Sequence, residues 1–207
     1  MKNYYCNSAP CFDGNSLVRI EANDNACPTT ILKKVSDIRA GDMVVSPAQG
    51  GQAVKVVCVL RTICSNNQAY LVELSNDLLI TPYHPVRMNG KWSFPCDIKE
   101  IKQLPCQFVY SFVLETGHSM EIGGIECVTY AHGFQEEVVR HEYFGTPRII
   151  DDLKKMNGWE SGYVTLPPNC LIRDPISRMV VGLINNNKQQ SRTEENLTLA
   201  NQAHIVC

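Results

Sequence analysis

Short segments in which apolar and polar residues alternate dominate the first two-thirds of the chain. Such alternation is typical of β-strands that bury one face. It is clearest in SLVRIEA (16–22) and AYLVELS (69–75), and the β-branched run VKVVCVLRTI (54–63) is long enough for a central strand. Later runs with strand character are DLLITP, QFVYSFVLE, SMEIGG and ECVTYAHG. The pattern predicts an all-β domain over about residues 9–133.

Turn-forming residues separate these segments. Met88-Asn89-Gly90-Lys91 predicts a tight hairpin, because Asn and Gly both accept the positive φ that a two-residue turn requires. The stretch ILKKVSDIRAGD (31–42) is expected to form a short helical or irregular turn before a strand in DMVVSP.

The pattern changes after residue 133. RIIDDLKKM (148–156) has helical character between Pro147 and Asn157-Gly158, and the proline-punctuated stretch 166–183 is mixed. The last segment is polar and low in apolar residues, which is typical of a disordered tail. We therefore divide the chain into an N-terminal flank, a β domain, a mixed extension and a tail, at residues 1–8, 9–135, 136–184 and 185–207.

Composition excludes several classes of function. Of the 207 residues 44% are hydrophobic and 19% charged, and the formal net charge is −2, so neither nucleic acid nor an anionic membrane is an expected partner. No apolar run reaches the roughly 18 residues of a membrane span, and no signal peptide is visible, so we expect a cytoplasmic location. The ten cysteines include no C-x-x-C pair, and we predict no metal site, cofactor or disulfide framework. Cysteines in apolar runs, such as Cys58 and Cys127, are expected to be buried.

Cys11 has a different setting, directly after Pro10 at the entrance of the first strand. A thiol there can attack the preceding peptide bond and convert an amide into a thioester. The fold must then polarise the carbonyl and protonate the leaving nitrogen. About seventy residues later, TPYHPV supplies Thr81 as a hydroxyl donor near the carbonyl oxygen and His84 as an imidazole. Taken alone, Thr81 at a strand end and His84 as a satisfied buried histidine are the alternatives.

The motifs resemble those of the hedgehog/intein (Hint) superfamily. CFDGNSLV resembles its first block, VSDIRAGDMVVSP the next stretch, LLITPYHPV its Thr-x-x-His block, and VYSFVLETGHSMEIGGIECVTYAHG its closing blocks. The continuation HEYFGTPRIIDDLKKMNGW resembles the eukaryotic Vint subgroup, which is often found beside von Willebrand A domains. The resemblance implies a compact, twisted all-β Hint fold with a small mixed C-terminal extension.

The resemblance also implies autoprocessing by an N-to-S acyl shift at Cys11, with Thr81 and His84 activating the bond before it. His118 and His132 match histidines of the closing blocks and are implied as further site residues. The substrate would be the chain's own N-terminal flanking polypeptide, and the acyl acceptor water or a small nucleophile. A longer precursor would include a von Willebrand A domain.

Two departures from the intein pattern restrict the reaction. Inteins end in His-Asn and the Asn side chain cyclises, whereas here His132 is followed by Gly133 and Phe134. Neither residue supplies a cyclising amide or an acyl acceptor, so splicing is not expected. Ser111 stands where inteins often carry an Asp, so that position lacks a carboxylate base.

Three alternatives remain open. Ser111 and the short stretch before Cys11 favour a catalytically degenerate Hint-fold binding or scaffold module. A cysteine hydrolase acting in trans would need a substrate cleft and an oxyanion hole, for which no motif is present. If Cys11, His84 and His118 converge, they could meet a divalent ion, which would inhibit by occupying the thiolate.

Overall fold

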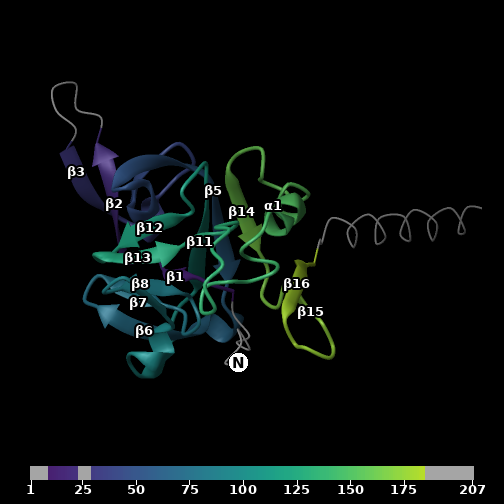
Figure 1. Cartoon of the computed structure of the whole chain (residues 1–207). Coiled ribbons are helices and arrows are strands. Elements are labelled where there is room, and N and C mark those ends of the chain that lie inside the picture. Colours follow the sequence, from purple (N-terminus) through teal and green to yellow (C-terminus); the bar gives the residue numbers. More distant parts are fainter. Residues whose placement is uncertain (1–8, 23–28, 185–207) are drawn as a thin grey trace, which may run out of the picture.

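The computed structural model describes residues 9–22 and 29–184, and the tail predicted from residue 185 lies outside them. The described chain consists mainly of strands (Figure 1), which confirms the all-β prediction. Its first part contains β1 (Phe12–Asp13), β2 (Leu17–Ala22), β3 (Thr29–Lys34), β4 (Met43–Ser46), β5 (Gln52–Ile63), β6 (Gln68–Ser75), β7 (Leu78–Ile80), β8 (Val86–Met88), β9 (Lys91–Ser93), β10 (Ile101–Pro105), β11 (Phe108–Leu114), β12 (Ser119–Ile122) and β13 (Ile125–Val128).

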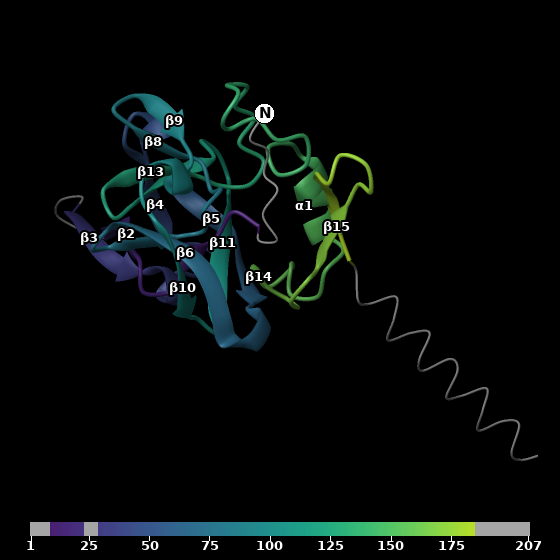
Figure 2. The same ribbon diagram turned by 90° about the horizontal axis from the view of Figure 1, so that it is seen from below.

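These strands form one extensive sheet in the order β10-β6-β7-β1-β11-β5-β4-β2-β12-β13-β8-β9, with β3 added beside β2. Long β5 joins its two halves, because its first residues pair with β4 and its later ones with β11. Both views show the twist that this arrangement produces (Figures 1 and 2).

Most predicted strands coincide with observed ones. SLVRIEA contains β2, VKVVCVLRTI lies within β5, and AYLVELS lies within β6. The predicted hairpin is also confirmed. Met88 pairs with Lys91, while Asn89 and Gly90 have φ values of 51° and 74°.

The prediction for residues 31–42 is wrong in its first part. The chain up to Lys34 belongs to β3, which pairs with β2 along its whole length, and only Val35–Asp37 form a 3₁₀ turn. Most side chains of β3 are exposed, so alternation gives little signal there. Hydrogen bonding to β2 therefore decides the conformation.

Strand β1 lies in the middle of the sheet, between β7 and β11. Phe12 is in register with Ile80 of β7 and Tyr110 of β11. Because β7 leads directly into TPYHPV, this register brings Thr81 beside Cys11, and the Thr81 N–H donates to the Cys11 carbonyl at 2.9 Å. The sheet thus aligns two segments that are far apart in the sequence.

The remaining elements lie together on one side of β5 and β11 (Figures 1 and 2). They are α1 (Arg148–Leu153), β14 (Tyr163–Leu166), β15 (Leu171–Arg173) and β16 (Val180–Leu183). The predicted helix is confirmed, although it ends at Leu153. Strand β14 adds to β5 in parallel, while β15 and β16 form a separate hairpin.

A second hydrophobic cluster joins these later elements to the sheet. It combines Cys11 and Leu60 with Leu153 and Val164, all nearly inaccessible to solvent. The side chain of Cys11 therefore lies in a core to which both parts of the chain contribute.

No helix among the described residues is long and apolar enough to cross a membrane.

Candidate active site

Two hydroxyl groups hold the two ends of the peptide bond before Cys11. Ser111 Oγ donates to the Pro10 carbonyl at 2.5 Å, and its Oγ lies 3.2 Å from Cys11 Sγ. Thr81 Oγ1 accepts from the Cys11 N–H at 2.9 Å and donates to the Ala9 carbonyl at 3.2 Å. Because a serine hydroxyl has one proton, the shorter contact assigns it to Pro10 and leaves Oγ to accept from the thiol.

This geometry differs from the roles predicted for the hydroxyl groups. Thr81 was expected near the carbonyl oxygen of the bond, but it holds the amide nitrogen instead. The donor at the carbonyl oxygen is Ser111, which the sequence presented only as a missing carboxylate. Ser111 lies in β11, next to Tyr110, which pairs with Phe12 of β1, and this register sets it against Pro10.

His84 lies in the same site, and one of its ring nitrogens has no hydrogen-bond partner among the described residues. Its Nε2 contacts the Val128 carbonyl at 2.8 Å, and since a carbonyl only accepts, Nε2 carries the proton. The lone pair of Nδ1 is buried and has no hydrogen-bond partner of good geometry among the described residues. Burial lowers the His84 pKa to about 4, against the opposing effect of the Val128 and Cys11 backbone. The ring is therefore neutral at pH 7 and can accept a proton at Nδ1.

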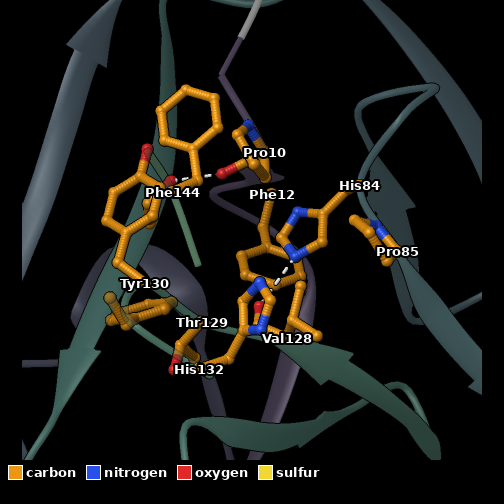
Figure 3. A pocket seen from close by; sticks show the side chains of 11 residues that line it. Pro10, Phe12, His84, Pro85, Val128, Thr129, Tyr130, His132 and Phe144 are labelled. Carbon is orange, nitrogen blue, oxygen red and sulfur yellow. Dashed lines mark hydrogen bonds between the residues drawn. The ribbon is translucent and has the colours of Figure 1, made fainter. Parts of the chain in front are cut away.

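His132 faces His84 across a small cavity, as Figure 3 shows. Its Nδ1 accepts from the Phe134 N–H at 3.1 Å, and burial lowers its pKa to about 4. His118 is not among the residues that line this cavity. Its charge adds to the effect of burial in lowering the pKa of His132, so it lies near that ring. Of the two further histidines, the structure brings His132 to the site and leaves His118 outside the cavity wall.

Two aromatic residues of the site were not predicted. Tyr130 and Phe144 stack with ring centroids 5.4 Å apart and line the cavity (Figure 3). Burial raises the pKa of Tyr130 well above its ordinary value, and its hydroxyl is close enough to Cys11 and Ser111 for both to affect that pKa. Tyr130 follows the end of β13 in a turn, so the alternation of a strand does not signal its position. No local signal marks Phe144 either.

The Cys11 thiol is fully enclosed. It is 1% exposed, and burial raises its pKa to about 12. At neutral pH it is a thiol, not a thiolate, and it needs a base to become nucleophilic. In the described part of the chain no group of three or more His, Cys, Asp or Glu side chains could hold a metal ion. Cys11, His84 and His118 accordingly do not form such a group.

Comparisons with known proteins bear on this site. The profile of the Vint family, described as a Hint domain, matches residues 10–182. Among solved structures, the gp41-1 intein has 13% identity and a TM-score of 0.42, and the match covers 59% of this chain and 100% of that chain. A DnaB intein from Synechocystis sp. PCC 6803 has 11% identity and a TM-score of 0.42, over 58% of this chain and 99% of that chain. No curated protein matches the sequence.

Proposed function

The chain belongs to the Vint family of Hint domains, an intein-like autoprocessing family, and we propose that it cleaves the bond before Cys11. The reaction is an N-to-S acyl shift on the Pro10–Cys11 bond, followed by hydrolysis of the thioester or its transfer to a small nucleophile, without splicing. One observation supports it most directly. Separate hydroxyl groups bind the carbonyl and the nitrogen of this one bond, and the thiol lies next to one of them.

In the first step Cys11 Sγ bonds to the carbonyl carbon of Pro10. The carbonyl oxygen gains negative charge, which the Ser111 hydroxyl stabilises through a hydrogen bond that strengthens as the charge develops. The bond from this carbon to the Cys11 nitrogen then breaks. The thiol proton ends on that nitrogen, so the products are a thioester and a free amine.

His84 is the group that we propose to carry this proton. Its bare Nδ1 lone pair has no other partner among the described residues, and the ring is held by the bond from Nε2 to Val128. Thr81 accepts a hydrogen bond from the Cys11 N–H and so fixes the direction of the nitrogen lone pair. His132 faces His84 across the cavity, and we propose that it supports His84 in carrying the proton. We propose that His118 acts only through His132.

In the second step water or another nucleophile attacks the thioester and releases the Cys11 thiol. The His132-Gly133-Phe134 sequence lacks a side-chain amide, so the reaction ends with cleavage. The substrate is the polypeptide before Cys11. The von Willebrand A domain, the division at residue 135 and the cytoplasmic location stay predictions.

A reporter domain fused before residue 1 tests the reaction. Incubation of the fusion with hydroxylamine or a thiol is expected to release the reporter with Pro10 as its last residue, as intact mass will show. Cys11→Ala should abolish release and His84→Ala should reduce it severely. Cys127→Ala, at a cysteine equally buried in the other hydrophobic cluster, is the matched control and should cleave normally.

The second candidate function is a binding or scaffold module that keeps the Hint fold without catalysis. It is favoured by the complete burial of Cys11, which raises the pKa of the thiol to about 12. The same fusion separates the two functions. A folded fusion that stays intact under hydroxylamine would exclude cleavage and leave the binding module.

A further inference from the structure

A pair of thiols lies close to β1, outside the cavity beside Cys11. Cys64 directly follows β5, and Cys106 stands between β10 and β11. The Cys64 N–H donates to the Gln107 carbonyl at 3.0 Å, which continues the β5–β11 ladder and holds the two backbones together. The two sulfur atoms are 3.9 Å apart. A disulfide has an S–S distance of about 2.05 Å, so its formation requires the two sulfur atoms to approach each other further.

The two thiols differ in accessibility and acidity. Cys64 is partly exposed, whereas Cys106 is buried. The hydrogen bond between the two thiols lowers the pKa of Cys64 and raises the pKa of Cys106, which burial and the charge of Cys64 raise further. Cys64 is therefore the more accessible and more acidic thiol, the one that meets an oxidant, and Cys106 is the thiol that can resolve the product.

Cys106 also has more acceptors than protons. Its sulfur lies 3.1 Å from the Phe108 carbonyl and 3.7 Å from Oδ2 of Asp13, in addition to Cys64. Its single S–H can satisfy only one of them at a time. The buried Asp13 carboxylate also accepts the Asn15 N–H through Oδ1 at 2.8 Å, so it keeps this partner when Cys106 loses its proton. Asp13 itself raises the pKa of Cys106, which makes Cys106 the less acidic thiol of the pair.

We propose that Cys64 and Cys106 form a redox-active dithiol that a peroxide, or exchange with a small disulfide, converts reversibly to an intramolecular disulfide. With hydrogen peroxide, Cys64 Sγ attacks one oxygen, the O–O bond breaks, and a sulfenic acid and water form. Cys106 Sγ then attacks Cys64 Sγ, the S–O bond breaks and a second water leaves. The two thiols lose two protons and two electrons, and the peroxide is reduced to two waters.

Oxidation is expected to be selective for this pair. Cys11 is enclosed, and burial raises the pKa of its thiol, so it offers little thiolate to an oxidant. Cys58 and Cys127 are buried as well, and burial likewise raises the pKa of each. The reaction requires no activity of Cys11, so it is tested independently of cleavage.

The experiment treats the folded full chain with equimolar hydrogen peroxide or with oxidised glutathione, blocks free thiols and maps tryptic peptides by mass spectrometry. The expected product joins the peptide of Cys64 to the peptide of Cys106 at a mass about 2 Da below the sum of the reduced peptides. Dithiothreitol should restore both thiols. Alkylation of Cys64 in the folded protein should fall by at least about tenfold after oxidation.

Variants separate the two roles. With Cys106→Ser, Cys64 should stop at the sulfenic acid and react with dimedone. With Cys64→Ser, Cys106 should stay reduced, because burial keeps the oxidant away from it. Cys96→Ser is the matched control, since Cys96 is also partly exposed, and it should still form the linkage. A linkage of Cys64 to any other cysteine, or a linkage that forms only after unfolding, would overturn the assignment.

Discussion

Replacing Ser111 by alanine removes the side-chain donor that the described residues place at the carbonyl oxygen of Pro10 and leaves the backbone of β11 in place. Loss of a donor to an oxyanion costs about 2.7–4 kcal/mol of transition-state stabilisation. The same hydrogen bond exists before the reaction, where its net contribution is about 1 kcal/mol. Only the difference slows the chemical step.

The difference is roughly 2–3 kcal/mol, which corresponds to a roughly 30- to 150-fold lower rate of cleavage. The free energy of unfolding should fall by about 1–3 kcal/mol, because the buried Pro10 carbonyl loses its donor. If Ser111 stabilises the oxyanion, the folded variant should also cleave more slowly by the factor given above. If Ser111 has only a structural role, stability should fall while the rate of cleavage by the folded variant stays the same.

The assay is the single-turnover rate of reporter release under hydroxylamine, with denaturant unfolding of the same variant. Thr129→Val is the matched control. Thr129 lines the same cavity, and its buried hydroxyl has no hydrogen-bond partner among the described residues. Its removal should leave both the rate and the stability nearly unchanged. If Ser111→Ala cleaves within about threefold of the parent rate while folded, Ser111 is not the oxyanion donor.

Three further predictions follow from the packing around the site. Burial lowers the pKa of His84, His132 and His141 to about 4, so between pH 6.5 and 4 the unfolded chain binds protons that the folded chain does not. The free energy of unfolding should fall as the pH drops through this window, by up to about 2 kcal/mol per histidine at pH 5. Denaturant titrations that give the same free energy of unfolding at pH 7 and pH 5 would contradict the burial of these rings. Gly145→Ala would put a Cβ 2.7 Å from the His141 carbonyl oxygen and 2.9 Å from Cε1 of His132. The substitution should therefore displace the His132 ring and slow cleavage. An unchanged rate would show that cleavage does not depend on the position of His132. A chain that ends at residue 135 would lose β14 from the edge of β5 together with half of the second hydrophobic cluster, and it should fail to show cooperative unfolding by circular dichroism.

The proximity of Thr81 to Cys11 could be predicted because local patterns determine the strands that carry them. The alternating strands fix the register of β7 beside β1, and that register alone brings Thr81 to Cys11. The contact of Ser111 with the Pro10 carbonyl could not be predicted in this way. A sequence comparison shows which residue type is absent, whereas the direction of a hydroxyl depends on the neighbouring strand.

Other features lack a local signal altogether. The segment that forms β14 has strand character, but nothing in it indicates that it pairs with β5 in parallel. Phe144 lies far from Cys11 in sequence and reaches the cavity because the later chain returns beside Ala131, whose N–H donates to the Phe144 carbonyl at 2.8 Å. Exposed β3 escaped prediction because its pairing with β2, not burial, determines its conformation.

Burial sets how the proton must move in the proposed reaction. With a thiol pKa of about 12 and an imidazole pKa of about 4, the neutral pair is much lower in free energy than the thiolate–imidazolium pair. Each pKa unit is worth about 1.4 kcal/mol, so separate ionisation would cost about 11 kcal/mol before the attraction between the two charges is counted. A free thiolate is therefore not a resting state of this site. The proton must leave Cys11 as its sulfur bonds to the Pro10 carbon, when charge passes to the oxygen that Ser111 binds. The Ser111 hydroxyl is then needed at the same moment as the base.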